Sequence, residues 1–222
     1  MINFLRTYSG VELIVVSLAF ILVILIALTI HEVAHSYVAF TQGDVTSKYF
    51  GRLSLNPAKH IDPIGFICLL LFGFGWAKPV PINTVKFKNY RKGIFLTSIA
   101  GVCANFILSF ISVGLLAFML KFVSHQMIVY NYFYKFLYHF LTFSATINLG
   151  LAIFNLLPIP PLDGFNVLTS LTKGNNKVVN FLVKYGFIIL LAVLLFGIID
   201  VIFSALYGVV IPAFTNFWQF IF

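Results

Sequence analysis

Charged residues are scarce in this sequence. Only 9% of its 222 residues are Asp, Glu, Lys or Arg, whereas 61% are hydrophobic. A soluble domain has about 25% charged and about 45–50% apolar residues. Because too little polar surface is available to cover a globule in water, the composition excludes a soluble enzyme, a disordered chain and a nucleic-acid-binding module. We expect an integral membrane protein.

Cysteine is also rare, and the sequence lacks the alternation of polar and apolar residues that marks membrane β-strands. Its two cysteines, Cys68 and Cys103, lie in apolar sequence and are expected to be buried small hydrophobes rather than disulfide partners or metal ligands. The apolar residues instead form long uninterrupted runs, which are typical of membrane helices. The predicted fold is therefore all-α, a polytopic helical bundle.

The apolar runs predict a single transmembrane domain, 1–222, with four spans. The first run, Leu13 to Ile30, is longer than the core of a signal peptide, which has about 7–15 residues, and is expected to be retained. Prolines at 158, 160 and 161 should break the third span. The last region, 185–222, is expected to contain one span, and the sequence does not decide whether an interfacial helix follows it. The predicted spans are 11–36, 94–120, 136–171 and 185–209.

A shorter apolar patch lies within residues 62–81. From Ile64 to Trp76 it has 13 residues, too few for a helix to cross a hydrocarbon core of about 30 Å. Gly73, Gly75 and two following prolines also disfavour a helix. We expect a re-entrant loop or short membrane-embedded strands beside a site, because irregular backbone is tolerated in a membrane only against protein or a water-filled cavity. A surface hairpin among the headgroups is the alternative.

The positive charge is distributed unevenly between the two ends of the predicted spans. Residues 37–93 and 172–184 carry 11 of the 14 Lys and Arg residues, and the other side carries Arg6, Lys121 and Lys135. Cytoplasmic loops of membrane proteins are enriched in Lys and Arg. The count places 37–93 in the cytoplasm and the amino terminus outside, so the net charge of +8 does not require a nucleic-acid partner.

The end of the first span contains His31-Glu32-Val33-Ala34-His35. Residues i and i+4 share one face of a helix, so both imidazoles can bind one cation. This spacing is typical of zinc metalloproteases, in which the glutamate takes a proton from the zinc-bound water. We therefore predict His31 and His35 as zinc ligands and Glu32 as the general base.

A third protein ligand is needed to leave one open position on a catalytic zinc. Asp163 is the best candidate, because it follows the proline-broken stretch within an apolar span. A capping role in the turn Pro-Leu-Asp-Gly is the structural alternative. Glu12, the only other glutamate, lies at the opposite end of the first span.

These motifs closely resemble those of the site-2 protease family of intramembrane zinc metalloproteases. The chain resembles the compact branch without PDZ or CBS domains, although Val102 replaces a proline that many members have. The family's first motif matches 31–35, its second matches Asn155-Leu156-Leu157-Pro158-Ile159-Pro160-Pro161-Leu162-Asp163-Gly164, and intermediate segments match 51–65 and 75–81. The resemblance implies a three-helix core, one Zn2+ per chain and Asp163 as the third ligand.

The resemblance also implies cleavage of peptide bonds in or near transmembrane segments, often after another protease has trimmed the substrate. Substrates would enter from the lipid, and Gly73 to Pro81 is expected to offer them an unpaired strand edge. Asn155 would stabilise the oxyanion, unless its amide only satisfies carbonyl groups at the proline break. Asn148 is a weaker candidate for that role. A prokaryotic plasma membrane is the expected location.

A membrane metal transporter or channel is the alternative function. It would account for histidine and aspartate at membrane depth. It leaves Glu32 without a role, however, and is therefore less favoured than a protease.

Overall fold

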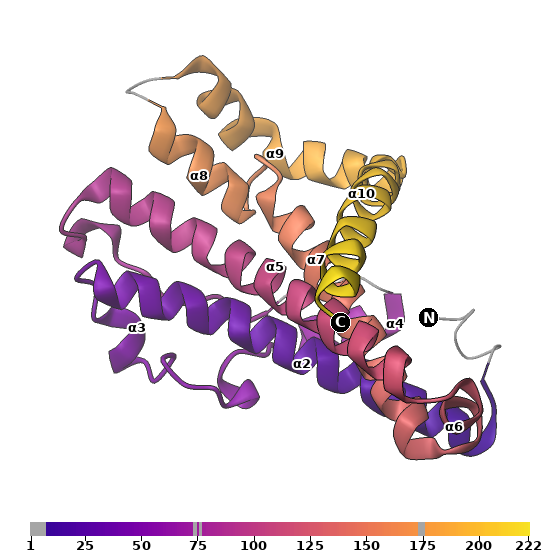
Figure 1. The fold of residues 1–222 in the computed structure, drawn as a ribbon. Helices are drawn as coiled ribbons and strands as arrows, with labels where there is room; N and C mark the ends of the chain where they lie inside the picture. The colour runs from indigo at the N-terminus through magenta and orange to yellow at the C-terminus, as the bar shows by residue number, and fades with distance from the viewer. Residues whose placement is uncertain (1–7, 73–74, 76, 173–175) are drawn as a thin grey trace.

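The computed structural model describes residues 8–72, 75, 77–172 and 176–222, which form helices joined by loops (Figure 1). In this part of the chain, the isolated bridge between Ile61 and Ala77 is the one β-type pairing. The predicted all-α fold is therefore confirmed. In chain order the helices are α2 (Gly10–Thr41), α3 (Thr46–Tyr49), η1 (Pro57–Lys59), α4 (Pro63–Phe72), η2 (Thr84–Lys86), α5 (Tyr90–Phe122), α6 (His125–Tyr130), α7 (Tyr132–Leu156), α8 (Asp163–Leu171), α9 (Lys177–Leu195) and α10 (Ile198–Ile221).

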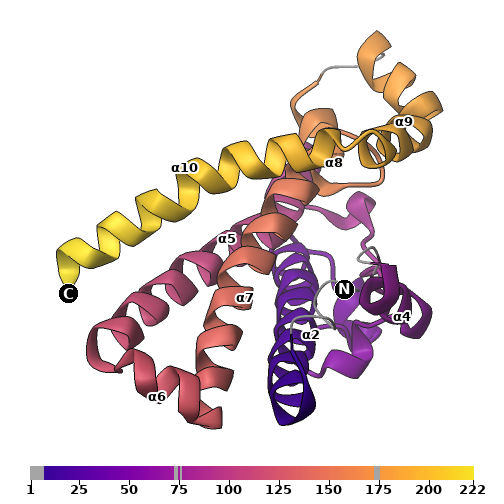
Figure 2. The same cartoon turned by 90° about the vertical axis from the view of Figure 1, so that its right-hand side faces the viewer.

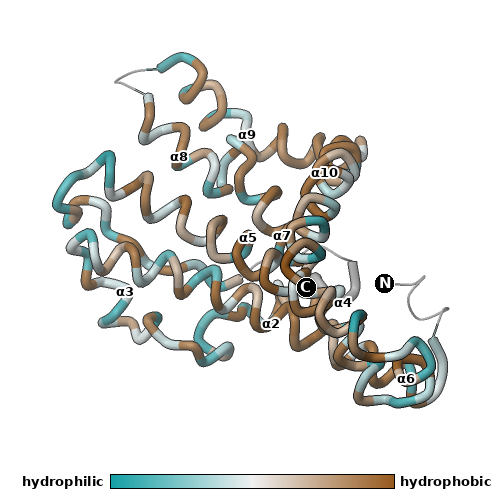
Figure 3. The backbone as a smooth tube through the Cα atoms, viewed as in Figure 1, coloured by the Kyte–Doolittle hydropathy of each residue, from teal (hydrophilic) through white to brown (hydrophobic). Residues whose placement is uncertain are grey.

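Five of the described helices, α2, α5, α7, α9 and α10, are long and apolar enough to cross a membrane. Hydrophilic residues gather near α3 and around α6, at the two ends of the core, and the middle is mostly hydrophobic (Figure 3). This distribution agrees with a polytopic protein that crosses a hydrocarbon layer between two aqueous surfaces.

Helices α2, α5 and α7 pack against one another and form the core of the bundle. Asn89 and Asn131 are the N-cap residues of α5 and α7. Their side-chain oxygens accept hydrogen bonds from the backbone N–H groups of Lys92 and Phe133 at 3.1 and 2.9 Å. Along α2, the completely buried residues include several alanines. Small residues let membrane helices approach closely, and dispersion contacts then stabilise the packing.

The third predicted span, 136–171, is divided into two helices. Helix α7 ends at Leu156, and Pro158 cannot continue it because proline lacks a backbone N–H and constrains the preceding residue. The chain turns through residues 157–162 and starts α8 at Asp163. The predicted aspartate therefore lies at the first residue of a new helix.

The last region also differs from the predicted span over 185–209. Helix α9 starts earlier, at Lys177, and ends at Leu195, and α10 follows from Ile198. Gly197 separates them with a φ of 68°, a left-handed conformation that favours glycine. Helix α10 then runs across the outside of α5 and α7 (Figure 2), where the Trp218 indole donates to the Phe110 carbonyl at 3.0 Å.

The predicted re-entrant segment, 62–81, contains the ten-residue helix α4. Its base is closed by the bridge between Ile61 and Ala77 and by the Lys78 N–H, which donates to the His60 carbonyl at 2.8 Å. The buried Arg52 guanidinium also donates to the Lys59 carbonyl beside this base. Residues 73, 74 and 76 lie outside the described part of the chain, so the strand edge predicted over 73–81 is described only at Gly75 and from Ala77 onward.

The loops at the α3 end are joined by a buried aspartate. Asp44 is completely buried, and its carboxylate accepts the Thr46 N–H at 2.9 Å, the Thr46 hydroxyl at 2.5 Å and the Asn83 N–H at 2.7 Å. Burial by itself would raise the pKa of Asp44, but these hydrogen bonds and the charge of Lys86 lower it below its usual value. Asp44 therefore connects the end of α2 to the segment that precedes η2.

The prediction of buried cysteines is wrong for Cys103. Both cysteines are free thiols, but Cys103 is exposed and Cys68 is half-buried. Gly101 and Asn105 of the same helix are buried in the core. Because Cys103 is two residues from each, the helical period points it to the opposite face.

Candidate metal centre

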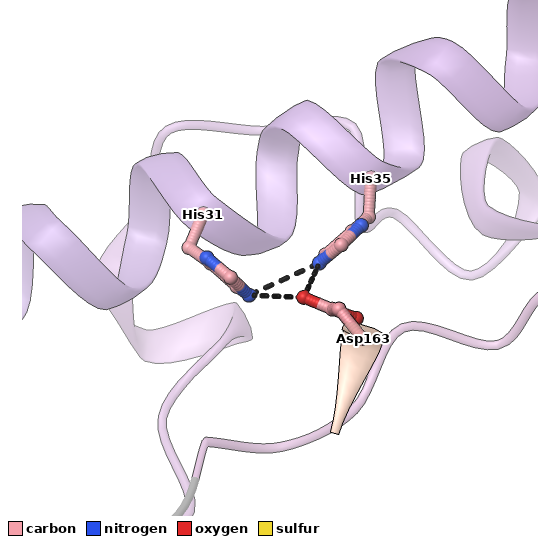
Figure 4. A group of neighbouring side chains, drawn as sticks. All are labelled: His31, His35 and Asp163. Atoms are coloured by element: carbon pink, nitrogen blue, oxygen red, sulfur yellow. Dashed lines mark hydrogen bonds and ion pairs between the residues drawn. The ribbon is translucent and has the colours of Figure 1, made fainter. Parts of the chain in front are cut away.

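The two predicted histidine ligands lie on the buried face of α2. His31 and His35 are each 6% exposed, and their Nε2 atoms are 3.0 Å apart (Figure 4). One helical turn separates the residues, so the imidazoles lie edge to face and direct Nε2 to the same point. The structure thus confirms that the two side chains share a face.

The proline break brings Asp163 to these histidines. Its Oδ2 atom lies 3.2 Å from the Nε2 atoms of both His31 and His35. Gly164 makes this approach possible, because a Cβ there would overlap the Leu156 carbonyl at the end of α7. A segment 128 residues beyond His35 therefore completes the cluster.

The geometry of the three side chains fits a zinc ion. Zinc bonds to nitrogen or oxygen at about 2.0–2.1 Å, which places two ligand atoms about 3.3–3.4 Å apart in a tetrahedron. The observed separations of 3.0, 3.2 and 3.2 Å are close to this value. His31, His35 and Asp163 are the His/Cys/Asp/Glu group in the described residues that could hold a metal ion. Three ligands would leave the fourth position open for chemistry.

Helix α5 orients His35 and leaves room for both rings. The Nδ1 atom of His35 is 2.7 Å from the Thr97 carbonyl oxygen, which accepts its proton and leaves Nε2 free for a metal. A Cβ on Gly101 would lie 2.5 Å from the His35 Nε2 and 2.6 Å from the His31 Cε1. A glycine is therefore required where α5 meets the metal centre.

Glu32 follows His31 directly and is half-buried. No hydrogen bond or ion pair joins its carboxylate to another of the residues that the structure describes. The carboxylate is thus available to bind a water molecule beside the cluster, although it does not belong to the group of three ligands.

The structure does not bring Asn155 into this cluster. Its amide Nδ2 donates to the Leu151 carbonyl of the same helix at 3.0 Å. Asn148 is almost completely buried in α7, where its Nδ2 donates to the Ser144 carbonyl at 2.8 Å. A role for either amide in stabilising an oxyanion stays a prediction.

Sequence reasoning did not identify Thr97 and Gly101 as parts of the site. Gly101 directly precedes Val102, where many members of the family have proline, but nothing in the sequence indicated that it lies against the two histidines. Thr97 acts through its backbone carbonyl, which any residue type would supply, so no side-chain pattern could have indicated it.

Comparison with known proteins decides the family. The family profile described as "Peptidase family M50" matches residues 19–193. The chain belongs to peptidase family M50. This is the site-2 protease family that the motifs resemble, and the match includes all three predicted ligands. No solved structure matches the chain.

Two relatives are named as zinc metalloproteases. The chain is 41% identical over 172 residues to the "Putative zinc metalloprotease YwhC" of Bacillus subtilis, an alignment that covers 77% of each chain. It is 27% identical over 186 residues to the "Putative zinc metalloprotease Rip2" of Mycolicibacterium smegmatis, with 79% of this chain and 67% of the relative covered. Membership of family M50 and the five apolar helices make this chain a multi-pass intramembrane zinc metalloprotease, as predicted. Nothing in these findings favours a transporter.

Proposed function

We propose that this M50 peptidase hydrolyses peptide bonds within or beside the transmembrane segments of other membrane proteins, with zinc held by His31, His35 and Asp163. The observation that carries the proposal is the convergence of three ligand atoms, separated by 3.0–3.2 Å, at the buried junction of α2 and α8. A transporter would need no general base, whereas here Glu32 lies next to the first ligand.

The protein groups have distinct roles in this reaction. Zinc, when bound, supplies a Lewis acid and lowers the pKa of its water to about 7. Glu32 accepts a proton from the attacking water and later donates it to the leaving amine. The buried packing around the cluster excludes bulk water, and low polarity strengthens electrostatic stabilisation of the transition state.

Asn155 is the proposed donor to the oxyanion. Its Nδ2 carries two protons, of which one is given to the Leu151 carbonyl at 3.0 Å. The other proton remains available as α7 ends, eight residues before Asp163. The side chain can therefore keep its bond to α7 and also donate to a reaction intermediate.

A cavity beside the core is the proposed route for substrates from the lipid. It has a volume of about 410 Å³ and reaches Leu28, which precedes His31 by less than one turn of α2. Its lining is largely apolar and comes from α2, α7, α9 and α10, with Gly75 from the predicted substrate edge. An unwound segment of a transmembrane protein fits this chemistry, because its side chains are apolar and its backbone needs hydrogen-bond partners.

The charge distribution supports an orientation with the metal centre toward the cytoplasm and the amino terminus outside. The division of the last region into α9 and α10 leaves this inference unchanged, because no Lys or Arg follows Lys184. The relatives described above are bacterial, which supports the plasma membrane of a prokaryote as the location.

Co-expression with a panel of single-span membrane proteins tests the proposal. Glu32→Gln should bind zinc in the wild-type ratio but cleave at least about 100-fold more slowly, because general acid–base catalysis typically contributes about 10²–10⁴-fold. His31→Ala, in contrast, should lose both zinc and cleavage. Wild-type cleavage by Glu32→Gln would contradict the proposed base, and zinc uptake into vesicles that survives this change would favour the transporter.

A further inference from the structure

Several polar atoms between the core helices are buried without a hydrogen-bond partner. Among the described residues they include the Nδ1 atom of His31, both amide atoms of Asn105 and the Oδ1 atom of Asn148. Asn105 is completely buried and Asn148 is 1% exposed. Because unpaired polar groups in a nonpolar interior are unfavourable, such atoms normally find partners in the working protein.

The two histidines differ in this respect. When zinc occupies Nε2, the ring proton must be on Nδ1, which needs an acceptor of its own. His35 has the Thr97 carbonyl at 2.7 Å, whereas His31 has no such partner in the described structure. The His31 ring is therefore held on one side only, unless another group reaches its Nδ1.

Asn105 is well placed to reach the ring of His31. A Cβ built on Gly101 would lie 2.7 Å from the His31 Nδ1, so this nitrogen faces α5 at that position. Asn105 follows Gly101 by one turn on the same face. Side chains of a helix lean toward its amino terminus, so the Asn105 amide extends over the turn of Gly101 and toward His31.

The other side of Asn105 faces α7. Helices α5 and α7 are antiparallel, and their register is fixed by hydrogen bonds from Ser109 to the Ala145 carbonyl and between the Ser112 and Ser144 hydroxyls, both at 2.7 Å. This register brings Asn105 level with Asn148. The amide of Asn148 is oriented by its bonds to Ser144, and its Oδ1 has no donor.

We propose that Asn105 is a positioning residue, which joins the His31 ligand to the polar network between α5 and α7. Its Oδ1 accepts the His31 Nδ1 proton and its Nδ2 donates to the Asn148 Oδ1, directly or through one ordered water. These two unpaired donors then each have an unpaired acceptor: the His31 Nδ1–H donates to the Asn105 Oδ1, and the Asn105 Nδ2 donates to the Asn148 Oδ1. The inference rests on the proposed role of His31 as a zinc ligand.

This arrangement predicts an effect on the metal rather than on the substrate. An acceptor at Nδ1 fixes the tautomer and the ring orientation of a ligating histidine and makes Nε2 a stronger base. Loss of such a partner typically weakens metal affinity about 10–100-fold. Asn105 touches no reacting atom in this scheme, so zinc affinity is the primary measurement.

Competition between the purified full-length protein and a zinc chelator tests the proposal. Asn105→Leu has a similar volume without hydrogen-bonding groups, and its zinc affinity should fall about 10–100-fold. Asn105→Asp keeps an acceptor at the same position and should retain wild-type or tighter affinity. Cobalt-substituted Asn105→Leu should also show shifted visible absorption bands, because the orientation of one imidazole is no longer fixed.

Ser109→Ala is the matched control. It lies one turn further along the same face and loses a buried hydrogen bond to α7, but it should bind zinc like the wild type. Wild-type affinity in Asn105→Leu, or an equal loss in Ser109→Ala, would overturn the proposal. If the Asn105→Leu protein does not accumulate, Asn105→Ala serves instead. Its zinc affinity should fall by the same factor, and wild-type affinity would again overturn the proposal.

His31→Ala separates a failure of this inference from a failure of the proposed function. If His31→Ala loses zinc but the Asn105 variants do not, only the positioning role is wrong. If His31→Ala keeps zinc at wild-type affinity, the ligand assignment is wrong and the inference falls with it.

Discussion

The α2–α5–α7 core and the α9–α10 pair are both apolar, but they are packed differently. In the most apolar segments of the core helices, 33–44% of residues are buried, whereas the corresponding values are 11% for α9 and 6% for α10. Core contacts run along whole helix faces through small residues, while α10 is held by separate contacts such as those of Trp218 and Tyr207. Hydrophobicity alone therefore does not distinguish the closely packed helices around the metal centre from α9 and α10 beside them.

The largest expected effect comes from breaking the core at Gly101. In Gly101→Ala the new Cβ would overlap the imidazoles of both His31 and His35, so α5 must move away or the ligands must turn. Overpacking costs about 1–3 kcal/mol, and displaced ligands weaken zinc binding further. We expect loss of most bound zinc, measured as metal content after purification, and loss of cleavage.

Gly208→Ala is the matched control on α10. A Cβ at Gly208 meets no atom within 4 Å, so this variant should keep zinc, cleavage and thermal stability. Equal losses in the two variants would show that α10 supports the metal centre as strongly as the core does.

The parts of the site that were predictable depend on local rules. Spacing of four residues on a helix places His31 and His35 together whatever the rest of the fold, and proline at 158 ends a helix wherever it lies. Asp163 was found because an acidic residue within an apolar stretch is expected to have a function. These signals need no knowledge of long-range packing.

The unpredicted parts depend on contacts between distant segments. The Thr97 carbonyl meets His35 only because α5 packs beside α2, which no local pattern shows. The division between α9 and α10 falls at Gly197 within continuous apolar sequence, where hydropathy does not change. Cys103 was assigned to the interior from its apolar neighbours, but in a membrane helix both the buried and the lipid-facing sides are apolar.

The second prediction tests how firmly the α3 end of the core is fixed. The pKa of Asp44 is lowered in the folded protein, so its contribution to stability is complete above the unfolded value of about 3.9 and is lost as pH falls through the lower folded value. Asp44→Asn should therefore be less stable than wild type at neutral pH, by about 1–3 kcal/mol for buried hydrogen bonds lost or weakened. Thermal unfolding in detergent between pH 7 and pH 3 should show a smaller dependence on pH in the variant.

Thr46→Val provides the intermediate case. It removes the hydroxyl that donates to Asp44 at 2.5 Å and leaves the two backbone donors. Its stability at neutral pH should lie between those of wild type and Asp44→Asn. If the stabilities of Asp44→Asn and wild type fell equally as the pH is lowered, the ionisation of Asp44 would make no contribution to the stability of the fold.

The third prediction concerns the attachment of α10. Trp218→Phe keeps an aromatic ring near Phe110 but removes the indole N–H that donates to the Phe110 carbonyl. We expect a loss of about 0.5–1.5 kcal/mol, the usual net contribution of one hydrogen bond, with zinc content unchanged. A loss of zinc in this variant would contradict the separation between the core and α10.

The smallest effect is expected at the end of the core opposite the metal centre, where Lys135 of α7 contacts Glu12 of α2 at 2.8 Å. The Glu12 side chain is 37% exposed, so solvent screens the pair, and exposed ion pairs contribute about 0.2–1 kcal/mol. Glu12→Gln should lower stability within this range, measured by thermal unfolding at low salt, and the difference from wild type should shrink at high salt. The single variant Lys135→Met and the double variant with Glu12→Gln complete a double-mutant cycle, which measures the coupling energy of the ion pair. A coupling well above this range would show that the ion pair is shielded from water, and the far end of the core would then be held as tightly as the metal centre.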